Sequence, residues 1–267
     1  MHFDQHLHSR FSQDGTPSIS DIAAIALDRG MTAITITDHF DLCDAEIGYR
    51  FYLDHEAARR EEFERAREEF DGRLEIGWGL EIGHPYQLPD VADHFLASRS
   101  FDFILGSVHF LRDGSDIYLI NYDSAEVIDR VFTEYFTDML ALIDFGGFDC
   151  LAHLDYPLRV MRNKISEPTV LPWRHLVEPI LEKLIKNNIA LELNTRGFMD
   201  WKGRQEPEDW VLSRYQEMGG RLITIGSDAH VLNAVGVSIP DAAQKAFDLG
   251  FREIAYYRAR QPVLYSL

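Results

Sequence analysis

Short apolar segments alternate along the chain with longer amphipathic or highly charged segments. The apolar segments are rich in β-branched and aromatic residues, which is typical of buried strands. Seven strands are expected, at residues 1–8, 32–37, 74–80, 103–108, 148–152, 189–193 and 222–225, with a weaker eighth at 254–257. Helices are expected between them, at residues 21–28, 55–70, 124 to about 144, 176–186, 207–218 and 240–249.

The regular alternation of strand and helix predicts a parallel sheet with crossover helices. No repeat, low-complexity tract or flexible linker divides the sequence, so residues 1–267 are expected to form a single domain. A closed barrel of about seven strands fits both the pattern and the length, because α/β barrels commonly take roughly 250 residues. An open, doubly wound sheet would show the same periodicity and stays an alternative.

The chain is acidic. Its 26 Lys and Arg stand against 44 Asp and Glu, which gives a formal net charge of −18. This balance argues against broad binding of duplex nucleic acid, which needs a basic face, but not against a small anionic substrate in a locally positive pocket. No window approaches the ~18 apolar residues of a membrane span, and the N-terminus does not resemble a signal peptide. With two cysteines, Cys43 and Cys150, a reducing, cytoplasmic setting is expected.

Polar side chains of the metal-binding type follow the ends of the expected strands. In a parallel barrel all these ends open on one rim, where such folds place their active sites. The residues concerned are His6, His8, Asp38, His39, Glu81, His109, His153, Asn194, Arg196, Asp228 and His230. Side chains more than 200 positions apart in the sequence are therefore expected to converge.

Two of these groups have the spacing of metal ligands. His6 and His8 place two imidazoles on the same face of a strand, where one ion can bind both, and Asp228 and His230 repeat this spacing. Glu81 lies among glycine and apolar residues, where a carboxylate needs a cation and could bridge two ions. Each residue taken singly could instead be structural. Together these residues offer more ligands than one ion binds, so two or three Zn, Mn or Fe ions are expected.

Six motifs follow one another along the chain: His6-x-His8, Thr37-Asp38-His39, Glu81, Gly106-Ser107-Val108-His109, Ala152-His153 and Gly226-Ser227-Asp228-Ala229-His230. Over residues 1 to about 235 this series resembles that of the PHP (polymerase and histidinol phosphatase) superfamily. The segments at residues 107–111 and 192–197 and the chain length resemble its stand-alone histidinol-phosphate phosphatases. The resemblance implies a distorted (β/α)7 TIM-like barrel with a trinuclear metal centre, and hydrolysis of L-histidinol phosphate to L-histidinol and phosphate in histidine biosynthesis.

The same resemblance implies a role for individual residues. A first ion would be held by His6, His8, Glu81 and Asp228, a second by Glu81, His109 and His153, and a third by Asp14, His39 and His230. The Ser-Gln-Asp-Gly sequence around Asp14 could equally be a plain turn. Arg196 and Arg159 would bind phosphate, since arginine offers a planar fork of donors, and a surface ion pair is the alternative for each.

The implied reaction is metal-assisted attack of water on a phosphate monoester. The sequence contains no D-x-D-x-T/V motif and no C-x5-R loop, which disfavours a covalent phosphoryl-enzyme. The acid that protonates the leaving group stays open between Asp38, Asp155, His84 and bulk water. Asp38 could instead orient His39 or a neighbouring ligand.

Two other functions compete with this one. A PHP-type phosphoesterase could act on nucleotides or other small phosphate esters, for which the −18 charge is no obstacle. A non-catalytic metal-binding barrel is the second alternative, although it would be expected to lack ligands or a cation for phosphate. The expected partner is a small phosphorylated substrate, with neither duplex nucleic acid nor membrane.

Overall fold

A mostly parallel sheet lies at the centre of the structure, a computed structural model that describes residues 2–43 and 48–267. Its strands are β1 (Phe3–Leu7), β2 (Ala33–Ile36), β3 (His39–Asp41), β4 (Glu75–Gly83), β5 (Phe103–Ser107), β6 (Cys150–Leu151), β7 (Ala190–Asn194) and β8 (Ile223–Gly226). They are ordered β1-β2-β4-β5-β6-β7-β8, and β3 pairs with the second half of β4. All these pairings are parallel.

The two ends of this sheet meet and nearly close it into a barrel. Leu7 and Ala229 form a parallel bridge, in which the His8 N–H donates to the Ala229 carbonyl (2.9 Å). The Asp228 N–H donates to the His6 carbonyl (2.8 Å). The predicted α/β barrel is therefore confirmed, and the open sheet is not formed.

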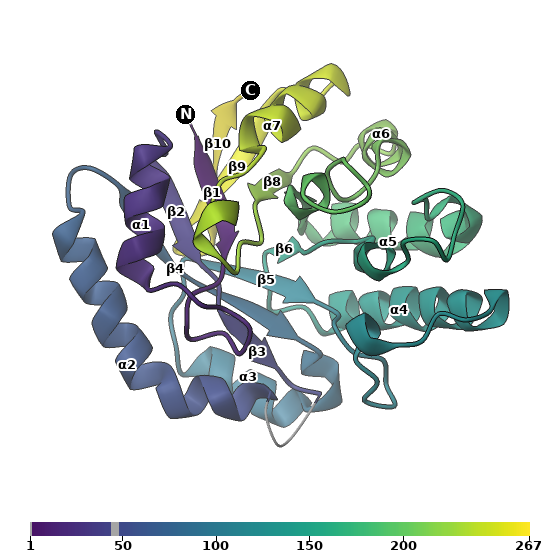
Figure 1. Ribbon diagram of the computed structural model, residues 1–267, viewed down its shortest axis with the longest axis horizontal. Helices are drawn as coiled ribbons and strands as arrows, with labels where there is room; N and C mark the ends of the chain where they lie inside the picture. Colours follow the sequence, from purple (N-terminus) through teal and green to yellow (C-terminus); the bar gives the residue numbers. More distant parts are fainter. Residues whose placement is uncertain (1, 44–47) are drawn as a thin grey trace.

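Helices surround the strands on the outside of the barrel (Figure 1). They are α1 (Ile19–Asp28), α2 (Gly48–Glu69), α3 (Pro89–Ala97), α4 (Ala125–Phe145), α5 (Arg174–Asn187), α6 (Asp209–Glu217) and α7 (Ile239–Asp248). Serine side chains cap two of them as N-cap residues: Ser18 accepts from the Asp21 N–H (3.1 Å), and Ser124 from the Val127 N–H (3.3 Å). Helix α3 has no counterpart among the expected helices, and α2 begins seven residues earlier than residue 55, where it is expected.

The weak eighth strand is real but does not belong to the barrel. Strand β9 (Glu253–Arg258) pairs antiparallel with β10 (Gln261–Ser266), and this hairpin packs against the opening opposite the rim. Gln5 joins it to β1: its Nε2 donates to the Ala255 carbonyl (2.7 Å), and its Oε1 accepts from the Tyr257 N–H (2.7 Å). Arg260 donates to Asp149, just before β6 (2.5 Å). The weaker strand expected at residues 254–257 is therefore formed, and it pairs antiparallel outside the seven-stranded series.

An apolar layer fills the barrel between this hairpin and the rim. It consists of Phe103, Leu105, Cys150, Ala152, Ala190, Ala255 and Tyr257, all buried. Above this layer, the polar side chains singled out in the sequence lie toward the C-terminal ends of the strands, as the sequence predicts.

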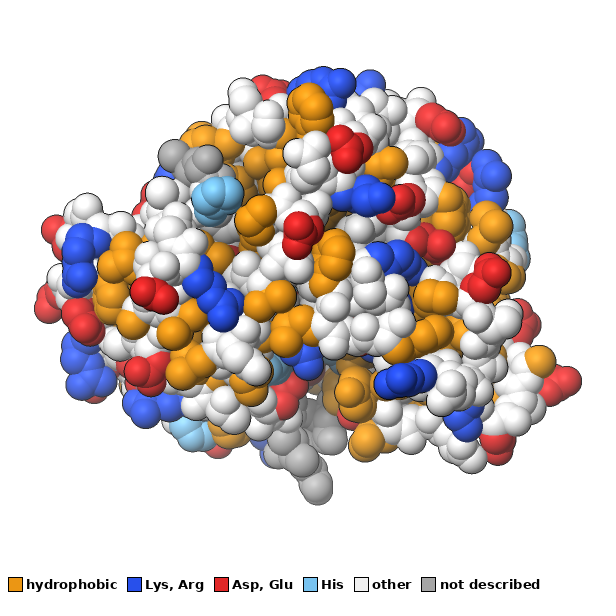
Figure 2. All heavy atoms as spheres, turned by 45° about the horizontal axis from the view of Figure 1, so that its top comes forward, with side chains coloured by type: hydrophobic (Ala, Val, Ile, Leu, Met, Phe, Trp, Pro, Cys, Tyr) orange, Lys and Arg blue, Asp and Glu red, His pale blue; other side chains and the backbone are white. Residues whose placement is uncertain are grey.

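The surface carries charges of both signs. On the face in Figure 2, acidic and basic side chains are interspersed, and apolar side chains lie between them. Helix α2, for example, contains the exposed pairs Arg65 with Glu61 (3.6 Å) and Arg60 with Glu64 (3.8 Å). Within residues 2–43 and 48–267, no helix is both long and apolar enough to cross a membrane.

Candidate metal centre

Glu81 is the hub of a polar cluster at the rim. It lies in β4, is fully buried, and is the register partner of His39 in β3. Its Oε2 is 3.3 Å from Nε2 of His6, 3.3 Å from Nε2 of His8, and 2.9 Å from Nδ1 of His39. Both imidazoles of the His-x-His pair thus face the same carboxylate oxygen, while Leu7 between them packs in the hydrophobic core.

The second oxygen of Glu81 serves another pair of histidines. Its Oε1 is 3.0 Å from Nε2 of His153, which follows β6, and 3.3 Å from Nε2 of His109, which follows β5. The two imidazole nitrogens are 3.3 Å from each other. Each oxygen of Glu81 therefore lies close to its own group of imidazole nitrogens. This is the arrangement expected of a carboxylate that bridges two ions.

Asp228 and Asp14 complete the cluster on its other side. Oδ1 of Asp228 is 3.5 Å from Nε2 of both His6 and His8. Asp14 approaches two histidines that are far apart in the sequence, with its oxygens 3.5 Å from Nε2 of His39 and 3.2 Å from Nε2 of His230. All nine residues singled out as metal ligands thus form one connected cluster, although they are spread over residues 6–230 of the sequence.

Several buried atoms of the cluster lie close to one another but make no hydrogen bond of suitable geometry with the described residues. They are Nε2 of His6, Nε2 of His8, Nδ1 of His39 and Oε2 of Glu81. Burial alone would raise the pKa of the Glu81 carboxyl, but the imidazoles of His6, His39 and His109 hold this pKa well below its usual range. Buried polar atoms without partners are costly, and cations bound among them would remove that cost. The cluster therefore fits divalent metals that take nitrogen and oxygen ligands.

A second carboxylate, Glu192 in β7, orients two of these ligands. Its Oε1 is 2.6 Å from Nδ1 of His6, so Nδ1 can donate to this carboxylate while Nε2 faces Glu81. Its Oε2 accepts from the His153 N–H (2.9 Å) and from Nδ2 of Asn194 (3.1 Å). Asn194 Nδ2 is also 3.3 Å from Asp228. Glu192 and Asn194 thus tie together ligands from three different strand ends.

Asp38 acts on His8 through a serine. Ser12 Oγ donates to Asp38 (2.9 Å), so Nδ1 of His8, 2.9 Å away, donates to the serine and keeps Nε2 unprotonated. Asp38 also accepts from Arg59 Nε (2.6 Å) and from Ser9. Burial alone would raise the Asp38 pKa, but the Arg59 guanidinium holds it below its usual value. This buried, ion-paired carboxylate has no proton to give.

Asp41 and His84 hold His109 in place. Asp41 accepts from Nδ1 of His109 (3.0 Å), which leaves Nε2 free to face Glu81. Nε2 of His84 accepts from the backbone N–H groups of His109 (3.0 Å) and Phe110 (3.1 Å). Burial lowers the pKa of His84 to about 4, which suits this acceptor role. His84 is therefore a neutral support of the loop and an unsuitable acid.

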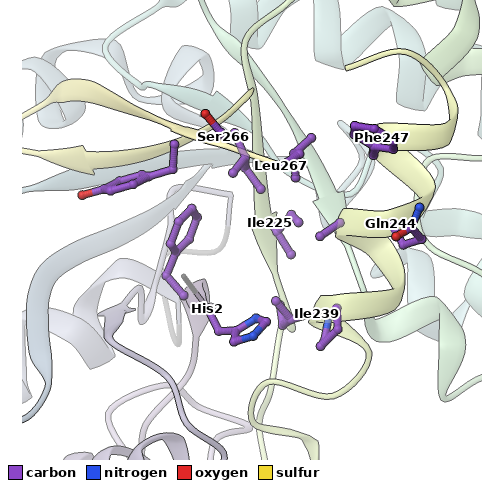
Figure 3. Close-up of a pocket in the computed structure, with 12 residues that line it drawn as sticks. His2, Ile225, Ile239, Gln244, Phe247, Ser266 and Leu267 are labelled. Atoms are coloured by element: carbon purple, nitrogen blue, oxygen red, sulfur yellow. The ribbon is translucent and has the colours of Figure 1, made fainter. Parts of the chain in front are cut away.

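A separate hollow of about 340 Å³ lies between α7, β8 and the C-terminal hairpin (Figure 3). Its walls are mostly apolar and include Ile225, Ile239 and Phe247. None of the metal-ligand candidates lines it, so it is not a place for the chemistry of the cluster.

Comparison with known proteins agrees with this geometry. Residues 4–196 match the family model of the PHP domain. The chain belongs to the PHP domain family. The chain is 30% identical over 257 residues to a protein of Clostridium acetobutylicum named "Probable histidinol-phosphatase", covering 96% of this chain and 97% of the relative. It is 29% identical to a protein of the same name from Thermotoga maritima, covering 94% of each chain.

A solved structure is similar over almost the whole chain. It is the crystal structure of histidinol phosphate phosphatase from Lactococcus lactis, in complex with zinc, L-histidinol and phosphate. The two chains are 26% identical and superpose with a TM-score of 0.83, covering 98% of each.

Two arginines at the rim of this PHP domain differ in what they contact. Arg159 is mostly buried and is committed to carboxylates, at 2.7 Å from Asp228 and 2.9 Å from Glu206. Arg196 follows β7 and is partly exposed. Its guanidinium has no ion pair or hydrogen bond within the described part of the chain, so it is available to an incoming anion.

Two of the candidate ligands have a backbone conformation that side chains rarely adopt. The φ angle is 24° at His153 and 53° at Asp228. Residues held in this left-handed region cost about 1–3 kcal/mol each and cluster at functional sites. In this PHP domain the surrounding hydrogen bonds of Glu192 and Asn194 hold the strained turns in place.

We expect Glu192→Gln to lower the affinity for divalent metal by about 10–100-fold, the usual effect of removing a group that orients a ligand. A glutamine can accept at its oxygen, but its NH2 would face either Nδ1 of His6 or the N–H of His153 as a second donor. Competition between the protein and a chelator measures this affinity.

The exposed Glu182→Gln on α5 serves as the control and should bind metal as the unmodified chain does. Unchanged affinity in Glu192→Gln would show that Glu192 has no part in orienting His6.

Proposed function

We propose that this PHP domain is a metal-dependent phosphatase that hydrolyses L-histidinol phosphate to L-histidinol and phosphate. The observation that supports this most directly is its likeness over 98% of its length to the Lactococcus lactis enzyme, which is complexed with zinc, L-histidinol and phosphate. The full set of nine candidate ligands supports a catalytic rather than a purely binding function.

We propose that three ions bind, and zinc, manganese and iron all suit the donor set. The first site consists of His6, His8, Glu81 and Asp228, the second of Glu81, His109 and His153, and the third of Asp14, His39 and His230. The donor atoms of His6, His8 and Glu81 lie within 4.8 Å of one another, as do those of Glu81, His109 and His153. When bound, the ions would lower the pKa of a water molecule and neutralise charge on the phosphate.

The residues of the chain supply orientation and positive charge. We propose that Arg196 takes phosphate oxygens in its planar fork of donors, and its guanidinium, which has no partner in the described chain, supports this role. Arg159 is fixed between Asp228 and Glu206 and contributes its charge from that position. Asp38 positions His8 through Ser12 and does not protonate the leaving group. Of the acids considered for that step, Asp155 and bulk water are left.

We expect Arg196→Met to lower kcat/KM for L-histidinol phosphate by about 100–1000-fold, as for the loss of one donor aimed at developing charge. Stability should stay the same, since the side chain makes no ion pair in the described structure. Steady-state kinetics and thermal unfolding of the variant measure both effects.

Arg73→Met is the matched control for Arg196→Met. Arg73 precedes β4 at the opposite end of the barrel and donates to the Glu69 carbonyl (2.6 Å). Its kinetics should be unchanged. If Arg196→Met lost no more activity than Arg73→Met, the phosphate role of Arg196 would be refuted.

A comparison of substrates tests the proposed function itself. Metal-free protein is given zinc, manganese or iron in turn, and turnover is measured on L-histidinol phosphate, on nucleoside monophosphates and on labelled single-stranded DNA. Preference for L-histidinol phosphate is expected. Faster turnover of nucleotides would overturn the substrate, and no turnover of any ester would favour a non-catalytic barrel.

A further inference from the structure

A groove of about 580 Å³ runs beside the metal centre. Its walls include Gln13, Asp41, Phe110, Ser115, Asp116 and Leu119. Three of these residues are in direct connection with the centre. Gln13 precedes Asp14, Phe110 follows His109, and Asp41 accepts from Nδ1 of His109 (3.0 Å). A molecule whose phosphate lay at the centre could therefore extend its other end into this groove.

A tight hairpin builds one wall of the groove. After His109 the chain turns back, and the Ile117 N–H donates to the His109 carbonyl (3.0 Å). The Leu111 N–H donates to the Ser115 carbonyl (2.9 Å). Phe110 and Asp116 are antiparallel bridge partners between these bonds. Side chains of such partners lie on the same face, so an aromatic ring and a carboxylate stand next to each other in the groove.

The charge of the groove is negative. Asp41 is committed to His109, whereas Asp116 is partly exposed and accepts at Oδ1 from the Tyr118 N–H (2.8 Å). The second oxygen of Asp116 has no partner among the described residues. Neither Lys nor Arg occurs among the described residues that line the groove. The groove would repel a phosphate group, but it would attract a cationic group at the other end of the same molecule.

We propose that this groove binds the organic end of the substrate, with the ammonium group against Asp116 and the imidazole ring against Phe110. This assignment rests on the proposed function, because it takes the phosphate to lie at the metal centre. L-Histidinol phosphate carries an amine and a ring at its end away from the phosphate, and the groove offers one carboxylate and one aromatic face for them.

Asp116→Asn tests the assignment. Asparagine keeps an oxygen that can accept from the Tyr118 N–H, so the hairpin should fold as before. We expect kcat/KM for L-histidinol phosphate to fall about 10–100-fold, mainly through KM, which is the range for losing a hydrogen bond to a charged group. Turnover of p-nitrophenyl phosphate, which lacks an amine, should change by less than about twofold because that contact does not exist for it.

Asp113→Asn is the matched control, since it removes a carboxylate from the same hairpin. Asp113 is exposed, accepts from the Ser115 N–H (2.9 Å) and does not line the groove. Its effect on both substrates should be small. Equal losses on both substrates in Asp116→Asn would overturn the groove assignment.

Inhibition by the product separates this assignment from the proposed function. L-Histidinol should inhibit hydrolysis of p-nitrophenyl phosphate by the unmodified protein, and Asp116→Asn should raise its inhibition constant by at least about tenfold. An unchanged inhibition constant would overturn the groove assignment. Failure of the unmodified, metal-loaded protein to hydrolyse L-histidinol phosphate would overturn the proposed function, whatever the inhibition shows.

Discussion

Replacing Glu81 by glutamine is expected to lower turnover of L-histidinol phosphate by roughly a thousandfold or more, since bound metal supplies several kcal/mol of transition-state stabilisation. Both oxygens of Glu81 face imidazole nitrogens, at distances from 2.9 Å to 3.3 Å. The amide of glutamine has no charge and one acceptor oxygen, so it cannot serve two ions. Metal content should fall to about one ion per chain or less, as measured by elemental analysis after gel filtration.

Glu75→Gln is the control for the Glu81 variant. Glu75 begins the same strand, is partly exposed and pairs with Arg258 (2.6 Å) at the other end of the barrel. It should leave both metal content and turnover unchanged. Thermal unfolding should show that both variants are folded. Full metal content and full activity in Glu81→Gln would contradict the central place given to this carboxylate.

Arg159→Met is expected to be the most destabilising of the substitutions considered, at about 3 kcal/mol in the free energy of unfolding. Breaking a buried ion pair by removing one partner costs about 3–5 kcal/mol, because a charge is left without compensation. Glu206 is fully buried and would keep Lys202 (2.8 Å) as its remaining partner, which favours the lower end of that range. Asp228 would lose a contact of 2.7 Å. Urea denaturation of the metal-free protein measures the change.

The exposed pair on α2 provides the comparison. Arg65→Met removes the partner of Glu61, 3.6 Å away, and should cost no more than about 0.5 kcal/mol. If Arg159→Met cost as little as Arg65→Met, the buried network of Arg159 would have no structural role, and a primary role in phosphate binding would become the better account of it.

The barrel could be predicted from the sequence because its strands are short apolar runs separated by helices with clear ends. Strand β3 and the antiparallel pairing of β9 with β10 could not be predicted, for physical reasons. Strand β3 has three residues and follows β2 after a break of two, so its pattern cannot be distinguished from an extension of β2. The hairpin of β9 and β10 lies outside the alternation, and its direction depends on contacts such as Gln5 with Ala255 that no local pattern shows.

Helix α3 could have been found. It begins at Pro89, and proline is favoured in the first turn of a helix, where its missing N–H costs nothing. Ala92 and Phe95, three positions apart, form its buried side. Its nine residues give only a short amphipathic pattern.

The candidate metal ligands other than Asp14 could be predicted as a set because each lies at or near the C-terminal end of an expected strand, and a parallel barrel brings those ends together. Asp14, in the loop after β1, could be singled out only through the resemblance to the PHP superfamily. The groups that orient the ligands were harder to find. Glu192 lies inside an apolar strand, and a carboxylate in such a place needs a donor or a cation, which was the available signal. Asp41 and Ser12 gave no signal, because their contacts with His109 and His8 depend on how β3 and the loop after β1 meet.

Titration of the metal-free protein with divalent metal, with hydrolysis of L-histidinol phosphate measured at each addition, tests the central claim most directly. The arrangement around Glu81 predicts that activity appears as two to three ions bind per chain and disappears when a chelator removes them. Full activity of the protein without metal, or no hydrolysis of L-histidinol phosphate by protein that holds two to three ions, would contradict it.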